Sequence, residues 1–159
     1  AARQIILNIS RLVMELRQVS ETIIHGISTR TNNDAEMGPN GKIPGLWQRF
    51  DVKVPVNYQG GERVYGVYYD YESDHTGMFN VLAGFDGASY PEDLEEITIN
   101  EGKYLVFSHK GEMPQIAIDA WTQVWQYFAG DACEHQRLFT TDFEYYPNGN
   151  QIDVCIAVK

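Results

Sequence analysis

RLFTTDFEYYPNGNQIDVCIAVK, residues 137–159, carries the clearest structural pattern in this chain. Residues 137–146 and 151–159 are rich in aromatic and β-branched side chains, which favour strands, and the Pro-Asn-Gly-Asn sequence between them is typical of a turn. The pattern therefore predicts an antiparallel hairpin that closes the fold. Glu144 is its unusual residue, because it places a carboxylate in the middle of an aromatic strand.

The segments before this hairpin predict two more strands and a helix. EEITINEGKYLVFSHKG, residues 95–111, predicts a hairpin that turns at residues 100–102. PQIAIDAWTQVWQYFAG, residues 114–130, predicts a helix that ends at Gly130. One stripe of this helix carries apolar side chains at helical spacing, namely Ala117, Trp121, Val124, Trp125 and Phe128.

The first half of the chain repeats this order. Residues 14–29 alternate in polarity as strands do, and a polar break over residues 30–42 follows them. IPGLWQRF, residues 43–50, has Pro44 near its start and apolar side chains at helical spacing, which predicts a helix. Residues 62–85 predict a hairpin in which ESDHTG, residues 72–77, forms the turn.

Short sequence echoes relate the two halves. The matching pairs are LWQRF (46–50) with VWQYF (124–128), VYYDY (67–71) with FEYYP (143–147), and FNVLAGF (79–85) with IDVCIAV (152–158). We interpret them as a duplicated strand-strand-helix-strand-strand unit. Two such ββαββ units predict an α+β fold with a largely antiparallel sheet, two helices on one face and a central ligand cleft between the halves.

The composition limits the classes of function. The chain has 159 residues, of which 43% are hydrophobic, and this is enough for one compact core. We assign that domain to residues 14–159 and treat residues 1–13, which have helical spacing, as an N-terminal extension. The formal net charge is −10, so we expect no direct contact with nucleic acid, because such binding depends on Lys and Arg.

Other patterns are missing from the sequence. No apolar run reaches the roughly eighteen residues of a membrane span, and no leader pattern is recognisable, which predicts a cytoplasmic protein without a membrane partner. Cys133 and Cys155 show no metal-binding spacing, and neither do the four histidines. We therefore expect neither a metal nor a cofactor.

Strand geometry leaves two interpretations of Glu144. Side chains alternate along a strand, so Glu144 and Tyr146 point to one face, and Phe143 and Tyr145 point to the other. One interpretation is that the face of Glu144 is solvated, as one face of many antiparallel sheets is. The other is that Glu144 lies at the floor of an aromatic pocket, where a lipophilic cation compensates the desolvated carboxylate and stacks on Trp and Tyr rings.

Five segments together resemble the GyrI-like effector-binding domains, the group that includes AraC-type ligand domains such as those of Rob-type regulators, and those of MerR-type multidrug-responsive regulators. The segments are IPGLWQRF (43–50), VYGVYYDY (64–71), GKYLVFSHKGEMPQ (102–115), AWTQVWQYF (120–128) and FEYYPNGNQIDVCIAVK (143–159). The resemblance covers residues 14–159 and rests on the order of these segments. It implies a duplicated α+β ligand-binding domain with a central cleft, in which a buried glutamate recognises amphipathic cations.

The resemblance also implies which residues bind the ligand. Glu144 matches the family's glutamate, and the predicted ligand-binding set is Glu144, Trp47, Tyr69, Trp121, Trp125 and Tyr146. The helical aromatics in this set fit a packing role equally well. In many relatives the last strand has a second Glu followed two residues later by an aromatic, where this chain has Asp153 and Cys155. Pocket size and ligand choice need not follow the family at those places.

The sequence therefore predicts a small-molecule-binding protein for amphipathic, cationic aromatic compounds. Many relatives are joined to a helix-turn-helix module that is not recognisable here, so we expect no DNA binding by this copy alone. Two roles then stay open: a free-standing binder, or a component that associates with a separate transcription regulator. A second hypothesis is a hydrolase of reactive small molecules, in which Glu144 acts as a general base on a bound water. A third is a docking module whose acidic surface binds a basic protein.

Overall fold

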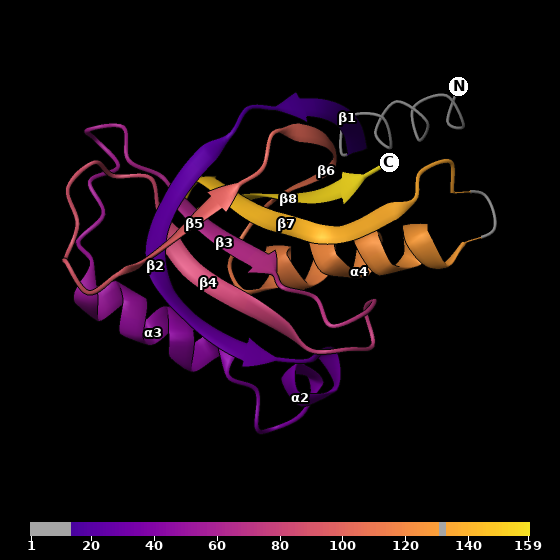
Figure 1. Cartoon of the computed structure of the whole chain (residues 1–159), viewed down its shortest axis with the longest axis horizontal. Coiled ribbons are helices and arrows are strands. Elements are labelled where there is room, and N and C mark those ends of the chain that lie inside the picture. The colour runs from indigo at the N-terminus through magenta and orange to yellow at the C-terminus, as the bar shows by residue number, and fades with distance from the viewer. Residues whose placement is uncertain (1–13, 131–132) are drawn as a thin grey trace.

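The computed structural model describes residues 14–130 and 133–159, so the prediction for residues 1–13 lies outside the described residues. The strands are β1 (Met14–Val19), β2 (Thr22–Thr31), β3 (Val64–Tyr69), β4 (Phe79–Phe85), β5 (Glu95–Ile99), β6 (Gly102–Lys110), β7 (Arg137–Asn148) and β8 (Gln151–Val158). The helices are α2 (Asn33–Met37), α3 (Ile43–Lys53) and α4 (Gln115–Ala129). Figure 1 shows the strands as one curved layer, with α3 and α4 on the same side of it.

All these strands join one antiparallel sheet in the order β1-β6-β8-β7-β3-β4-β2-β5. The order is symmetric about its centre: β1 to β4 of the first half of the chain occupy places that mirror those of β5 to β8 of the second half. Strands β3 and β7 therefore meet at the centre, and β1 and β5 lie at the edges. This order confirms the predicted α+β fold with duplicated ββαββ units. The two halves join where Gly66 of β3 lies opposite Glu144 of β7.

Two of the three predicted hairpins are confirmed, and one is wrong. Strands β3 and β4 pair with each other, as do β7 and β8. Residues 95–111 do form two strands, but β5 pairs with β2 and β6 pairs with β1. The short connection at residues 100–101 is therefore a bend and not a hairpin turn.

The bend has a physical explanation in the strand register. Met14 lies opposite Phe107 and Val19 opposite Gly102, and beyond the bend Thr22 lies opposite Ile99. The register is the same on both sides, so residues 14–26 and 95–107 act as two long, bent strands that pair with each other along their whole length. Strand β5 of the second half thus pairs with β2 of the first half, and β1 of the first half pairs with β6 of the second. This exchange forms the same kind of backbone hydrogen bonds as a β1–β2 hairpin and a β5–β6 hairpin would form.

The two faces of the sheet are both apolar but carry different layers. On the helix side, α4 packs on β6 and β8 and α3 packs on β2 and β4. On the other side, Ile24, Val67, Leu82 and Phe143 belong to a core that the curved sheet itself encloses. Two helices on one face were predicted, and the short helix α2 was not, because its segment was read as a polar break.

The buried residues of α4 include Val124 of the predicted stripe, while Ala117, Trp121 and Phe128 of that stripe are only half-buried against the core. Ile116, Ala120 and Val124 are its buried residues, spaced four apart, whereas Trp121 is half-buried and Trp125 is exposed. The predicted stripe therefore points to the edge of the packed face. This rotation is what makes the two tryptophans available to a cavity beside the helix.

The start of α3 is fixed by a side chain of α2. The Glu36 carboxylate accepts hydrogen bonds from the backbone N–H groups of Lys42 at 2.8 Å and Ile43 at 2.9 Å. These are orphan donors of a helix N-terminus, where a negative charge is also favourable. Pro44 at the first turn fits the same geometry. Trp47 lies one turn after Ile43 in α3, so this capping also fixes the position of Trp47 near the centre of the sheet.

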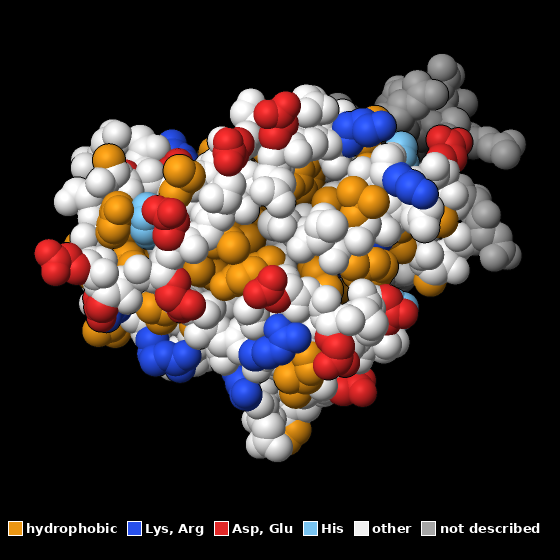
Figure 2. Space-filling model, in the orientation of Figure 1, with side chains coloured by type: hydrophobic (Ala, Val, Ile, Leu, Met, Phe, Trp, Pro, Cys, Tyr) orange, Lys and Arg blue, Asp and Glu red, His pale blue; other side chains and the backbone are white. Residues whose placement is uncertain are grey.

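The surface of the described residues adds two findings. None of their helices has both the length and the apolar character that crossing a bilayer requires. On the face shown in Figure 2, acidic and basic side chains are interspersed with apolar ones and do not gather by charge. The net negative charge is therefore not concentrated on that face in a single acidic surface.

Candidate functional site

A central cavity of about 700 Å³ lies between α2, α3 and α4, above the β3–β7 junction. Its walls are mostly apolar and aromatic. The lining includes Trp47, Tyr68, Tyr71, His75, Trp121, Trp125, Arg137, Glu144 and Tyr146. The volume lies within the range of about 300–1,000 Å³ that is usual for small-molecule sites.

Glu144 lies at the floor of the central cavity with 4% of its surface exposed. Its Oε2 accepts hydrogen bonds from Trp121 Nε1 at 2.7 Å and from the Tyr68 hydroxyl at 3.0 Å. Its Oε1 accepts one from the Tyr146 hydroxyl at 2.9 Å. No Lys, Arg or His in the described part of the chain forms an ion pair with it. The carboxylate is thus bound by neutral donors alone.

Gly66 makes room for this carboxylate from the neighbouring strand. A Cβ atom at this position would clash with Glu144 Oε1 and lie 3.1 Å from Cζ2 of Trp47. Only glycine lets the backbone of β3 approach both side chains so closely. The cavity floor is therefore built from the two halves, with the glycine in one and the glutamate in the other.

The protonation of this cluster is governed by burial. Burial raises the pKa of Glu144 above its ordinary value, and the hydrogen bonds from Trp121, Tyr146 and Tyr68 oppose that rise because they favour the ionised form. Burial, together with the nearby Glu144 carboxylate, holds the pKa of Tyr68 and of Tyr146 well above 10.0. Both tyrosines therefore remain neutral donors over the physiological range.

Aromatic rings stack around the carboxylate in contact with one another. Trp47 meets Tyr146 edge to face, with the ring centroids 5.8 Å apart. Trp121 lies 4.9 Å from Tyr68 and 6.3 Å from Trp125 by the same measure. Rings in such contacts hold one another in place and present π faces that attract cations.

A buried ion pair borders the same cavity. Arg137 Nη2 donates to Asp142 Oδ2 at 2.8 Å, and the two side chains are 7% and 0% exposed. In a regular strand these residues, five positions apart, would point to opposite faces. The β7 strand has a register shift between them, and Phe139 within it has a φ of +54°, so both side chains reach the helix side.

Asp142 also accepts hydrogen bonds from the Tyr71 hydroxyl and from the backbone N–H of Ala157. Its charge is therefore satisfied inside the protein by three donors. The guanidinium of Arg137 lies 4.3 Å above the Phe139 ring. The two charges of this pair compensate each other, whereas no basic side chain of the described residues pairs with Glu144.

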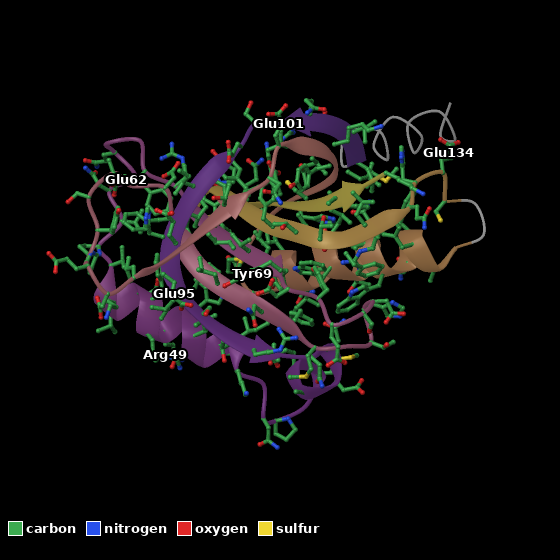
Figure 3. All side chains as sticks on the ribbon, in the orientation of Figure 1. Arg49, Glu62, Tyr69, Glu95, Glu101 and Glu134 are labelled. Atoms are coloured by element: carbon green, nitrogen blue, oxygen red, sulfur yellow. The ribbon has the colours of Figure 1, made fainter. Side chains whose placement is uncertain are left out.

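Five of the six predicted site residues line the central cavity, namely Trp47, Trp121, Trp125, Glu144 and Tyr146. Tyr69 does not, because it points to the other face of β3 and packs on the enclosed core. It lies near Ser28 and Glu95, as Figure 3 shows for Glu95. Its neighbour Tyr68 takes the place that was predicted for it.

The polar residues of the cavity wall that the sequence did not predict are Asn33, Glu36, Tyr68, Tyr71, His75, Thr122 and Arg137. Side chains alternate along β3, so Tyr68 lies on the same face as Gly66, and Tyr69 lies on the other face. Because Gly66 lies opposite Glu144, Tyr68 is the tyrosine on the side of the cavity. Asp153 and Cys155 lie on the face opposite Glu144, where Asp153 accepts a hydrogen bond from Ser108 at 2.7 Å. They do not line the central cavity.

The described residues contain no cluster of His, Cys, Asp and Glu with the geometry of a metal site. Burial raises the pKa of the Cys155 thiol, which disfavours the reactive thiolate. The floor of the central cavity therefore offers the buried Glu144 carboxylate together with the two phenols and the indole N–H that donate to it.

The comparisons with known proteins find relatives that share this fold. The Vibrio cholerae integron cassette protein VCH_CASS2 has a solved structure that is 40% identical to this chain, with a TM-score of 0.85 over 92% of this chain and 96% of that one. The candidate transcriptional regulator YobU of Bacillus subtilis is 27% identical, over 84% of this chain and 90% of YobU. The structure of SAV2435 bound to tetraphenylphosphonium is 20% identical, with a TM-score of 0.69 over 92% and 93% of the two chains, and shows the shared fold.

Residues 15–158 match the family described as Cass2, integron-associated effector-binding protein. The match covers nearly all residues that the structure describes, including both halves of the sheet and the cavity between them. The predicted resemblance to GyrI-like effector-binding domains is confirmed by this match and by the shared fold. The chain belongs to the Cass2 family of integron-associated effector-binding proteins.

Proposed function

We propose that the central cavity binds amphipathic, cationic aromatic compounds and that Glu144 is the anionic anchor. One observation carries this proposal: a buried carboxylate meets three neutral donors and no basic side chain of the described residues, inside an aromatic cavity. Such a carboxylate is costly to ionise without a partner. A ligand cation is the partner that the site lacks.

The kind of cation follows from desolvation. A compact ammonium loses a strongly bound hydration shell on entering an apolar cavity, whereas a delocalised aromatic cation loses much less. The rings of Trp47, Trp121 and Tyr68 supply contact area for flat or multi-ring ligands. The binding of tetraphenylphosphonium by the structural relative SAV2435 supports this class of ligand.

We also propose that binding is read out by transcription. The relative YobU is described as a candidate regulator, and the family is named for effector binding. In this proposal the chain acts together with a separate DNA-binding regulator, since its own charge of −10 disfavours contact with phosphates.

The hydrolase and docking hypotheses place different demands on Glu144. As a general base in a hydrolase, Glu144 would need a water and an acid beside the substrate, yet its oxygens already accept from three donors. An acidic docking surface would instead use exposed carboxylates, and it would leave the buried Glu144 without a role. Small-molecule binding is the function that uses both its burial and its aromatic neighbours.

The test uses two ions of matched size and opposite charge, tetraphenylphosphonium and tetraphenylborate. Each is titrated calorimetrically into the wild type, Glu144→Gln and Glu101→Gln. Glutamine keeps an acceptor for Tyr68 and Trp121, and the Tyr146 hydroxyl can turn to accept from its amide, so the variant preserves the hydrogen bonds. Glu101→Gln removes the same charge from an exposed bend far from the cavity (Figure 3).

We expect the wild type and Glu101→Gln to prefer the cation, and Glu144→Gln to lose roughly tenfold or more of that preference. Circular dichroism checks that each variant is folded. Equal binding of the two ions by the wild type, or an unchanged preference in folded Glu144→Gln, would overturn the proposal.

A further inference from the structure

A second cavity of about 720 Å³ lies next to the central cavity. His75, Trp125 and Arg137 line both, so the two spaces meet at these three side chains. The second cavity lies between the last turn of α4 and the start of β7. Because the central cavity alone is large enough for one aromatic cation, the second one offers room for another part of the same ligand.

The positive charge at the junction does not bar a cation from passing. Arg137 is paired with the fully buried Asp142 at 2.8 Å, and its guanidinium is covered by Phe139 on one side. The ring of Phe128 lies 5.8 Å from the same guanidinium. The charge of Arg137 is thus neutralised locally by Asp142, although its Nε has no hydrogen-bond partner among the described residues. The junction also presents the Trp125 indole, which is 38% exposed.

The second cavity combines aromatic walls with two exposed carboxylates. Trp125, Phe128 and Phe139 supply rings, and Asp74 and Glu134 supply carboxylates. Among the described residues, neither carboxylate forms an ion pair with Lys or Arg. Figure 3 places Glu134 in the connection from α4 to β7. The second cavity therefore resembles the central one in chemistry, although its carboxylates are more exposed.

We propose that the two cavities together take one elongated dication, with one cationic ring system against Glu144 and the other beside Asp74 and Glu134. An apolar linker passes between the cavities along Trp125. This inference rests on the proposed function, because the first cationic end uses the Glu144 anchor. It goes further in naming a class of ligand whose two charges are separated by a chain of fixed length.

The experiment compares matched phosphonium probes by calorimetry, above the titration range of histidine. One series consists of alkane chains with a triphenylphosphonium group at each end, in increasing linker length. The other carries the same alkane chain on a single triphenylphosphonium group and ends in a methyl group. The proteins are the wild type, the double variant Asp74→Asn/Glu134→Gln, and the control Glu92→Gln/Glu101→Gln, which removes two exposed charges from outside both cavities.

Asn at position 74 can still accept the hydrogen bonds that Asp74 receives from the backbone N–H and hydroxyl of Thr76, so the turn is kept. In the wild type and the control, we expect the dication of optimal linker length to bind roughly three- to tenfold more tightly than its monocation, with one ligand per chain. The Asp74→Asn/Glu134→Gln variant should lose this advantage and keep the wild-type affinity for the monocation.

Three results would overturn the inference: a dication that is no tighter than its monocation at any linker length, an advantage that persists in the Asp74→Asn/Glu134→Gln variant, or one ligand shared by two chains. Failure of the monocation to bind would instead contradict the proposed function. The two failures are therefore distinguishable in one set of titrations.

Discussion

Trp121 of α4 donates its indole N–H to Glu144 of β7 across 2.7 Å, on the same carboxylate oxygen that accepts the Tyr68 hydroxyl of β3. One oxygen atom thus joins a helix and a strand of the second half to a strand of the first half. The candidate anchor is also a structural link across the β3–β7 junction. Its protonation and its surroundings should therefore affect ligand binding and folding together.

Cation binding should weaken as the pH falls through the raised pKa of Glu144. Burial keeps the proton on this carboxyl at pH values where an exposed glutamate has lost it. A neutral carboxyl offers no charge to a cation, so the affinity is full above that pKa and lost below it. The Kd of tetraphenylphosphonium, measured as a function of pH, should have its midpoint above the ordinary Glu value of 4.5.

The raised pKa of Glu144 also determines how the free energy of unfolding changes with pH. The folded state prefers the protonated carboxyl, so the contribution of Glu144 to the free energy of unfolding is present below its unfolded pKa and is lost as the pH rises through its folded pKa. In Glu144→Gln, both the binding profile and this part of the stability profile should become flat. A binding midpoint at or below 4.5 in the wild type would contradict the buried-anchor interpretation.

Tyr68→Phe and Tyr69→Phe form a matched pair on opposite faces of β3. Losing the Tyr68 hydroxyl removes a donor that favours the ionised carboxylate, so the pKa of Glu144 should rise further and the binding midpoint should move to higher pH. Tyr69 packs on the enclosed core, so its substitution should leave the midpoint in place. Equal shifts in the two variants would show that the assignment of faces is wrong.

Much of the fold could be predicted because its signals are local. The turn at 147–150, the Pro44 helix start and the apolar spacing of α4 each act over a few residues, and all three elements were found. The pairing of β5 with β2 and of β6 with β1 depends on which distant strand completes the ladder. No signal at the bend distinguishes that exchange from a hairpin, so the partner of residues 95–99 could not be read from the sequence.

The site residues also divide into those with a local sequence signal and those that depend on distant contacts. Glu144 could be singled out because a lone carboxylate among aromatics on a strand needs an explanation. Tyr68 and Tyr69 are chemically identical neighbours, so only the register with β7 tells which one faces the cavity. Arg137 was missed because a regular strand would point it away from Asp142, and the irregularity between them is not marked by a glycine.

Gly66→Ala should damage both folding and binding. The added methyl group would occupy the space of Glu144 Oε1 and press on Trp47, so the carboxylate or the ring must move. Overpacking of this kind costs roughly 1–3 kcal/mol, and we expect a loss of this size in urea denaturation together with weaker cation binding. Gly102→Ala is the control, because a Cβ there has no neighbour within 4 Å. Similar stability and binding in the two variants would contradict the close packing at the floor.

Removing the guanidinium of Arg137 should destabilise the protein through the charge that it leaves behind. Arg137→Met strands the fully buried Asp142 carboxylate with only Tyr71 and the Ala157 N–H as donors, at a cost of roughly 3–5 kcal/mol in the free energy of unfolding. The double variant Arg137→Met/Asp142→Asn removes that charge and should recover more than half of the loss, since asparagine still accepts from Ala157.

Arg49→Met is the control for Arg137→Met, because Arg49 is an exposed residue of α3 and its loss should change the stability by less than about 0.5 kcal/mol. Urea denaturation of the four proteins measures the three differences from the wild type. If Arg137→Met cost no more than Arg49→Met, the pair would not be buried as described. If the double variant recovered nothing, the loss would come from packing of the Arg137 side chain on Phe139 and not from the stranded Asp142 charge.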